Sequence, residues 1–333
     1  MFPRRPFPFP HAPPRWNGTA ALPRHRLPSL LFLPPAGPIF SFVSFPRSSV
    51  LTQFQNLATD HTSGATELIH RLVAVCEHCA IGNSIRDLDE GLAMLEHAQA
   101  SMPSFHAVLN ILKSEFLPRL GPGGDISDAI GYLSSLQKIL DESGEAIAHF
   151  FVQLFPGPVC VATLSRSGTV LSALRLLVSE KLLDHLYVLE ARPMMEGLKT
   201  IREFNRSTPS TLFVDAGMAE ALAMSDCAVV GADCVSADGF LLNKTGTQPL
   251  ALCCRERGIP LYVLCDSLKF SPQLRENILV EDSPADDVVR LEDGDTFAVW
   301  NRYFEWTPID LVTAFITERG AFPPDQLSRL AGE

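Results

Sequence analysis

From Val159 onward, short apolar runs alternate with segments of helical periodicity, and this alternation restricts the fold more than any other feature. The apolar runs are Val159–Thr163, Leu186–Glu190, Thr211–Val214, Ala228–Ala232, Leu261–Cys265 and Thr296–Trp300. The helical segments between them are Thr169–Glu180, Met195–Phe204, Met218–Met224 and Thr247–Arg257. Such alternation gives right-handed crossovers and a parallel sheet covered on both faces. We therefore predict an α/β, Rossmann-like domain for residues 156–333.

The preceding part of the chain has helical periodicity throughout. Apolar residues recur every three or four positions in four segments, Ala65–Ala80, Ile85–Ala100, Ser104–Phe116 and Ile126–Phe150. Pro103, Pro118 and the run Gly121-Pro122-Gly123-Gly124 interrupt this pattern. The sequence therefore predicts an all-helical domain over residues 60–155.

The first 59 residues differ in composition from the rest. They contain no Asp or Glu, six arginines and twelve of the 26 prolines. Acid-poor, arginine-bearing leaders are typical of organelle transit peptides, but prolines this dense prevent the amphipathic helix that such peptides use. Prolines also interrupt the apolar run Leu30–Phe45, which excludes a membrane span there. We predict a disordered leader, with a mitochondrial transit peptide and a mistaken gene start as alternatives.

The overall composition restricts the kinds of binding partner and the cellular compartment that we expect for this chain. The formal net charge of −11 and the pI near 5.3 are unfavourable for direct nucleic-acid binding. Eight scattered cysteines indicate reduced thiols and a cytoplasmic protein. Cys76-Glu77-His78-Cys79 has metal-like spacing, but no second pair completes a four-ligand site. We expect neither a metal nor another cofactor.

The segment Val229–Thr247 carries the strongest chemical signal. Its pattern predicts a buried strand that ends at Asp233 and is followed by a tight turn. Asn243 and Lys244 are then predicted to open a helix. In open α/β sheets, the carboxyl ends of strands and helix N-termini hold phosphorylated ligands. Burial beside an apolar strand raises the pKa of a carboxyl group and suits Asp233 to proton transfer. The alternative is an Asp that caps a turn and a solvated lysine.

Three other strand ends carry polar residues. The first strand is followed by a turn whose backbone amides, hydroxyls and guanidinium suit a phosphate: Ser165, Arg166, Ser167 and Gly168. The same serines also suit helix capping, and both interpretations stay open. Arg192 either faces the ligand or pairs with Glu190, and Asp215 is predicted to cap the next helix.

Three motifs together resemble one protein family. They are Gly231–Thr247, Gly258–Val263 followed by Ser267–Phe270, and Asn301–Pro308 followed by Thr317–Gly320. This family unites the alpha, beta and delta regulatory subunits of eukaryotic translation initiation factor 2B with the isomerases of methylthioribose 1-phosphate and ribose 1,5-bisphosphate. The resemblance runs from about residue 63 to the C-terminus. It implies a helical domain joined to a Rossmann-like domain of the sugar-phosphate isomerase and CoA-transferase type, with dimerisation through the latter.

The resemblance also implies site residues. The isomerases use an aspartate and a cysteine as proton-transfer partners, and these positions correspond here to Asp233 and Ser165. A hydroxyl has too high a pKa for this role without a dedicated base. The phosphate-binding arginines of the isomerases have no counterpart in Ser63-Gly64-Ala65 or Met102-Pro103-Ser104. A glutamine of the family is replaced by Glu196, whose negative charge is expected to oppose a phosphorylated substrate.

These departures favour a non-catalytic protein that resembles the regulatory subunits. We expect it to act as a homodimer or as a hetero-oligomer with initiation factor 2B subunits, and to sense a sugar phosphate or a nucleoside monophosphate. One alternative is a diverged isomerase that converts an aldose 1-phosphate to the ketose. A stand-alone metabolite-binding homologue is the third.

Overall fold

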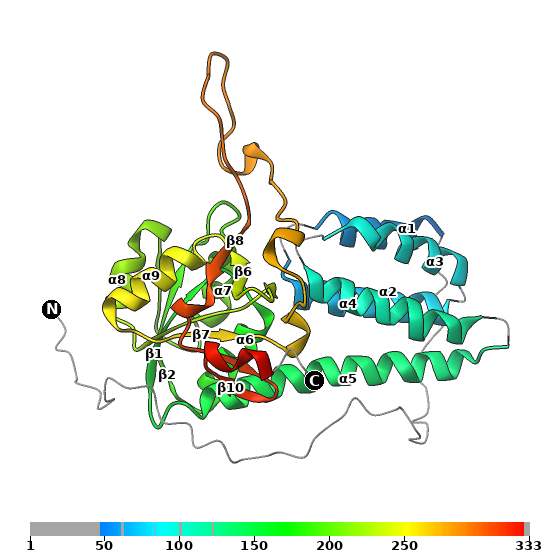
Figure 1. The fold of residues 1–333 in the computed structure, drawn as a ribbon, viewed down its shortest axis with the longest axis horizontal. Coiled ribbons are helices and arrows are strands. Elements are labelled where there is room, and N and C mark those ends of the chain that lie inside the picture. Colours follow the sequence, from blue (N-terminus) through cyan, green and yellow to red (C-terminus); the bar gives the residue numbers. More distant parts are fainter. Residues whose placement is uncertain (1–46, 61–62, 83, 100–101, 122, 330–333) are drawn as a thin grey trace. The chain divides into compact units, whose positions relative to one another are not determined.

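The computed structural model describes residues 47–60, 63–82, 84–99, 102–121 and 123–329 (Figure 1). Most of the predicted disordered leader lies outside these residues. Within residues 47–59, however, the prediction of disorder is wrong, because Arg47–Ala58 forms helix α1. Its apolar side chains Val50, Phe54 and Leu57 are buried against the helices that follow. The sequence did contain a signal for this helix, because apolar residues recur every three or four positions at the end of the proline-rich segment.

The N-terminal part is helical, as predicted. It contains α1, Ala65–Ile81 (α2), Ile85–Met94 (α3), Pro103–Ile111 (α4) and Ile126–Val152 (α5). Helix α3 ends earlier than predicted and continues as the 3₁₀ turn Leu95–His97, and α4 widens into the π-helical turn Leu112–Phe116. Buried apolar side chains from α1 to α5 form one core.

The C-terminal part contains a seven-stranded sheet in the order β10-β9-β7-β4-β1-β2-β3. Its strands are Val159–Leu164 (β1), Leu183–Leu189 (β2), Ser210–Phe213 (β3), Cys227–Val230 (β4), Leu261–Leu264 (β7), Ala314–Thr317 (β9) and Gly320–Phe322 (β10). Neighbouring strands are parallel except for β10, which pairs antiparallel with β9. The predicted Rossmann-like parallel sheet is confirmed.

Helices cover both faces of this sheet. They are Gly168–Ser179 (α6), Glu196–Phe204 (α7), Met218–Ala223 (α8) and Thr247–Arg257 (α9). Apolar residues of α6 and of the end of α5 pack on one face, and those of α8 and α9 pack on the other. Helix α5 buries Leu133 in the helical core and Phe151 against the sheet, so it joins the two parts. None of the described helices combines the length and apolarity that a bilayer crossing needs.

A small antiparallel sheet departs from the predictions. It consists of Cys234–Val235 (β5), Phe240–Lys244 (β6) and Phe304–Pro308 (β8), in the order β5-β6-β8. The predicted helix Thr247–Arg257 is observed as α9. The placement of Asn243 and Lys244 at the opening of this helix is wrong, because both residues lie on β6. Pairing with β8, some sixty residues away, overrides the local pattern.

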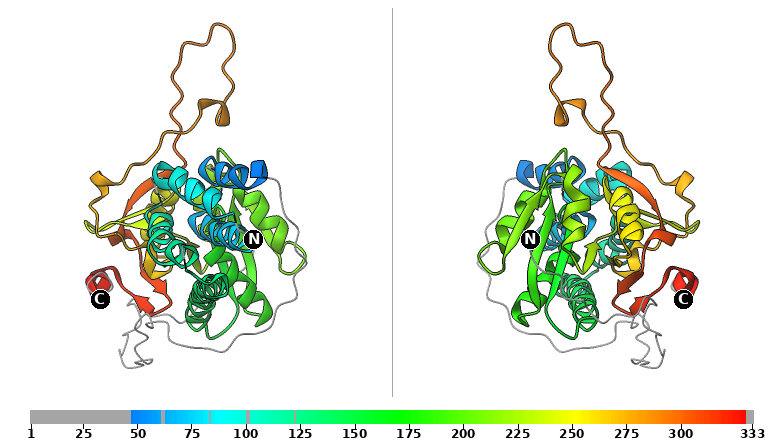
Figure 2. Two further views of the ribbon diagram at one scale, coloured as in Figure 1. Left: turned by 90° about the vertical axis from the view of Figure 1, so that its right-hand side faces the viewer. Right: turned by 90° about the vertical axis from the view of Figure 1, so that its left-hand side faces the viewer.

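The predicted strand Thr296–Trp300 is also absent from the described chain. It belongs to a segment with little regular structure, residues 279–300, which extends away from the sheet (Figure 2). Its large apolar side chains are exposed, Phe297 by 54% and Trp300 by 66%. An apolar run becomes a strand only where a partner strand accepts its backbone hydrogen bonds, and the described structure places none beside this one.

Candidate functional site

The loops that follow β1 and β4 meet at the carboxyl edge of the large sheet. The two strands are parallel neighbours, so their carboxyl ends lie side by side. Gly231, directly after β4, approaches Ser167 so closely that a Cβ atom on Gly231 would lie 2.8 Å from the Ser167 Cβ. Any other residue at position 231 would push the two loops apart.

Asp233 lies at this edge and is 7% exposed. Its carboxylate accepts a hydrogen bond from the backbone N–H of Ala65, the first residue of α2. Burial raises the pKa of the Asp233 carboxyl, while Lys269, the Ala65 N–H and Lys244 each offset part of that rise. The raised pKa is the one expected from the sequence. A carboxyl with these neighbours is able to give and accept a proton nearer neutrality than an exposed Asp.

Lys269 is a buried charge that the sequence analysis did not assign to the site. It is 2% exposed, on the 3₁₀ turn Ser267–Lys269, and its Nζ donates to Ser104 Oγ at 3.0 Å. Ser104 belongs to α4, so this bond links the helical part to the sheet part. The available signal was the position of Lys269 just beyond the carboxyl end of β7.

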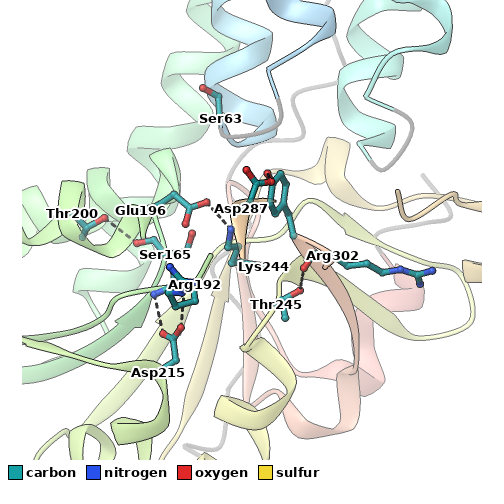
Figure 3. A network of polar contacts seen from close by, with 12 residues as sticks. Ser63, Ser165, Arg192, Glu196, Thr200, Asp215, Lys244, Thr245, Asp287 and Arg302 are labelled. Atoms are coloured by element: carbon teal, nitrogen blue, oxygen red, sulfur yellow. Dashed lines mark hydrogen bonds and ion pairs between the residues drawn. The ribbon is translucent and has the colours of Figure 1, made fainter. Parts of the chain in front are cut away.

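Lys244 and Glu196 form a buried ion pair (Figure 3). Lys244 Nζ lies 2.7 Å from Glu196 Oε1, and the two side chains are 6% and 7% exposed. Lys244 also lies 4.9 Å from the centre of the Tyr303 ring, whose hydroxyl donates to Asp287. The pair neutralises the charge by which Glu196 was expected to repel a phosphorylated ligand. It also engages Lys244, which was predicted to hold the ligand.

The start of α9 is not an open anion site. Glu305 Oε1 accepts hydrogen bonds from the backbone N–H groups of Gly246 and Gln248, both at 2.8 Å. The Asn243 amide donates to Thr247 Oγ1 at 2.9 Å, which fixes the turn from β6 into α9. A carboxylate from β8 thus occupies the place that the sequence analysis assigned to a phosphate. Sequence reasoning missed Glu305 because β8 itself was missed.

The turn after β1 presents Ser165, Arg166, Ser167 and Gly168 at the same edge. Ser165 has a φ of +67°, and its carbonyl accepts a hydrogen bond from Thr200 Oγ1 at 2.9 Å (Figure 3). Ser167 precedes α6 but makes no side-chain capping bond, so the capping interpretation is not supported. The Arg166 guanidinium pairs with Glu203 at 3.0 Å.

Arg192 and Asp215 are arranged differently from either prediction. The Asp215 carboxylate accepts hydrogen bonds from the backbone N–H groups of Ala191 at 2.8 Å and Arg192 at 2.7 Å (Figure 3). It therefore holds the loop after β2 instead of capping a helix. The Arg192 guanidinium donates to the Val288 carbonyl at 2.8 Å and not to Glu190. The predicted pairing of Arg192 with Glu190 and the predicted capping by Asp215 are wrong, because the observed bonds join segments distant in sequence. The prediction that Arg192 faces a ligand stays a prediction.

A cavity of about 460 Å³ opens between the N-terminal end of α2 and α7. Its charged lining is balanced, with Glu67, Glu196 and Glu203 against Arg166, Lys199 and Arg202. Asp233, which is buried, is not part of the lining. Within the described residues, no group of three or more His, Cys, Asp or Glu is arranged to hold a metal ion.

Comparisons with known proteins agree with this architecture. The model of the initiation factor 2 subunit family matches residues 49–324. A ribose 1,5-bisphosphate isomerase of Haloterrigena turkmenica is 33% identical over 187 residues, covering 52% of this chain and 57% of that protein. A methylthioribose-1-phosphate isomerase of Drosophila persimilis is 33% identical over 189 residues, covering 51% of this chain and 52% of its own length.

The chain is also similar to a solved structure over nearly the whole length of that structure. The translation initiation factor eIF-2B of Pyrococcus horikoshii OT3 superposes with a TM-score of 0.69 at 25% identity. The match covers 85% of this chain and 99% of the other. By contrast, the chain spans about half the length of the two isomerases that it matches in sequence.

Proposed function

Because the chain belongs to the initiation factor 2 subunit family, we propose that it binds a phosphorylated sugar at the carboxyl edge of its sheet and converts it from aldose to ketose. The observation that carries this proposal is Asp233, a buried carboxyl with a raised pKa beside Lys269 and Lys244. The relatives at 33% identity that are named as isomerases of ribose 1,5-bisphosphate and methylthioribose 1-phosphate support it.

The chemistry requires a group that moves protons. Conversion of an aldose to a ketose removes a hydrogen from C2 and delivers one to C1, so a residue must accept a proton and return it. Asp233 is that residue in this proposal, and Lys269 stabilises its ionised form. Arg166, Lys199 and Arg202 line the cavity and would attract the phosphate. Because Asp233 is buried and does not line the cavity, this proposal requires a local rearrangement that brings the substrate to its carboxyl group.

The test is direct turnover. The purified protein is incubated with ribose 1,5-bisphosphate and, separately, with methylthioribose 1-phosphate, and the ketose is followed by NMR. We expect one of the two ketoses to form, and Asp233→Asn to abolish its formation. If neither ketose forms in the presence of the wild-type protein, the isomerase proposal is rejected.

A second candidate is the non-catalytic subunit expected from the sequence. The observation that favours it is Ser165, a hydroxyl at the position where the resemblance implies a thiol, with no hydrogen-bonded base in the described chain. In this case the cavity senses a sugar phosphate or nucleoside monophosphate. Binding without turnover, together with co-purifying initiation factor 2B subunits, would support this candidate. Binding without turnover or partners would instead indicate a stand-alone metabolite-binding homologue.

We also propose that the chain self-associates through its C-terminal part. The segment 279–300 exposes several large apolar side chains, Leu279, Val288, Val289, Leu291, Phe297 and Trp300. Apolar side chains gathered on one surface segment are typical of protein interfaces. Sedimentation of the Phe297→Ser/Trp300→Ser variant should give a smaller native mass than the wild type. Val214→Ser, which alters an apolar side chain that is 60% exposed elsewhere, is the matched control and should leave the mass unchanged.

The compartment proposed for this protein is the cytoplasm. All eight cysteines are free thiols, as expected where thiols stay reduced. Import of a fluorescent fusion into mitochondria, directed by residues 1–46, would overturn this assignment.

A further inference from the structure

Glu196 has one carboxylate oxygen whose bonding is incomplete. Its Oε1 is bound to Lys244 at 2.7 Å, whereas its Oε2 is buried and has no hydrogen-bond partner within the described chain. A buried acceptor without a donor is unfavourable, and a charged one is more so. Such an atom in a native structure indicates a partner that the folded chain alone does not supply.

The position of Glu196 indicates where that partner binds. Glu196 is the first residue of α7 and lines the cavity of about 460 Å³. The cationic side chains of this cavity, Arg166, Lys199 and Arg202, also come from the turn after β1 and from α7. Arg166 is already paired with Glu203, which leaves Lys199 and Arg202 as the cations without an ion pair in the described structure. The cavity therefore offers an acceptor at one place and positive charge at another.

We propose that Glu196 Oε2 is the acceptor for a ligand hydroxyl, and that the ligand's phosphate lies away from it, toward Lys199 and Arg202. This inference rests on the proposed function and assigns the orientation of the sugar phosphate within the cavity. A carboxylate oxygen accepts only, so it selects a donor such as a hydroxyl and rejects a phosphate oxygen. Lys244 bonds Oε1 and offsets the charge of Glu196, while Oε2 is left without a hydrogen-bond donor in the described chain.

The Glu196→Gln variant tests this assignment sharply. The Lys244 ammonium only donates, so the glutamine turns its carbonyl oxygen toward Lys244 and its NH₂ group takes the place of Oε2. A ligand hydroxyl can still accept from that NH₂, but the bond loses its ionic partner and about half its strength. A phosphate oxygen, in contrast, gains a donor at this place.

The measurement is calorimetric binding of four probes: ribose 1,5-bisphosphate, its 2-deoxy analogue, its 3-deoxy analogue and inorganic phosphate. In the wild type, we expect removal of one of the two hydroxyls to weaken binding about tenfold, the usual effect of a lost bond to a charged group. In Glu196→Gln, binding of ribose 1,5-bisphosphate weakens, that same deoxy analogue loses little further affinity, and inorganic phosphate binds equally or more tightly.

Glu67→Gln is the matched control. Glu67 lines the same cavity from the first turn of α2 but is exposed, so its substitution removes the same charge without changing a buried acceptor. It should slightly strengthen the binding of ribose 1,5-bisphosphate and of inorganic phosphate. The affinity lost on removal of the sugar hydroxyl should stay the same as in the wild type. Glu196→Asp, which keeps the charge but withdraws the oxygen by one methylene, should reproduce the weakened sugar binding. Thermal unfolding of each variant confirms that it is folded.

The outcomes separate this inference from the proposed function. If the wild type binds ribose 1,5-bisphosphate without turnover, the isomerase proposal fails and the orientation stands. If Glu196→Gln tightens sugar binding as Glu67→Gln does, or leaves the affinity lost on removal of the sugar hydroxyl unchanged, the charge alone matters and the orientation is wrong. If the wild type binds neither the bisphosphate nor its analogues, both proposals fall.

Discussion

The two edges of the large sheet contain carboxyl groups with raised pKa values in contrasting surroundings: Asp226 is exposed and Asp233 is buried. At the amino edge, Asp226 precedes β4 and accepts a hydrogen bond from the Cys160 N–H at 2.7 Å. At the carboxyl edge, Asp233 follows the same strand and meets the N–H of Ala65 and two lysines. Desolvation raises the pKa of both carboxyl groups. The shared shift shows that desolvation alone does not identify a site, whereas the lysines at one edge do.

The largest difference that we expect between Asp233 and Asp226 is in their effect on turnover. Replacing Asp233 with Asn removes the proposed proton carrier and should lower turnover by about 100-fold to 10,000-fold. Asp226→Asn changes a carboxyl at the other end of the same strand and should alter turnover less than about threefold. The assay is ketose formation at saturating sugar phosphate. Equal losses in both variants would show that Asp233 acts through stability, as Asp226 does.

The second prediction concerns the ion pair at the carboxyl edge. Lys244→Met leaves the Glu196 charge buried and alone, which should destabilise the protein by about 3–5 kcal/mol. The exposed pair of Arg255 with Asp310, at 3.9 Å, provides the control, and Arg255→Met should cost less than about 1 kcal/mol. Urea unfolding at neutral pH measures both. A small loss for Lys244→Met would mean that water reaches Glu196 in solution.

The sequence could predict the local features of the carboxyl edge but not the contacts between distant segments that complete it. Local patterns placed β1, β4 and α9 correctly, because an apolar run or a helical period reports its own burial. They also placed Asp233 at the carboxyl edge with a raised pKa. They did not predict that Glu196 would bind Lys244, or that Glu305 would occupy the start of α9. Those contacts join segments about fifty to sixty residues apart, and only the folded sheet brings them together.

A third, smaller effect concerns Ser165. If the hydroxyl at this position is what limits proton transfer, Ser165→Cys should raise turnover about tenfold, because a thiol ionises far more readily than a hydroxyl. Cysteine is close to serine in size and keeps the same backbone at φ +67°. Ser167→Cys, two residues along the same turn, is the control and should not raise turnover. Unchanged turnover in Ser165→Cys would indicate that turnover is limited by the burial of Asp233 or by weak binding of the phosphate.

The smallest expected effect is the pH dependence of stability. A carboxyl whose folded pKa is raised above its ordinary 3.8 binds its proton more tightly in the native state. Its contribution to stability is therefore present below that value and is lost as pH rises through the folded pKa. We expect Asp226→Asn and Asp233→Asn each to reduce the stability that the wild type gains between about pH 7.5 and about pH 4.5, measured by urea unfolding relative to the wild type.

Lys269 makes this pH effect distinguish the two edges. Its charge is the largest influence that lowers the pKa of Asp233, and it is not among the groups that influence Asp226. In a Lys269→Met background the pKa of Asp233 should rise further, so Asp233→Asn should then remove a larger pH-dependent stability difference than it does in the wild type. The effect of Asp226→Asn should be the same in both backgrounds. If Lys269→Met changes neither difference, the lysine does not act on Asp233, and the carboxyl edge loses the feature that sets it apart.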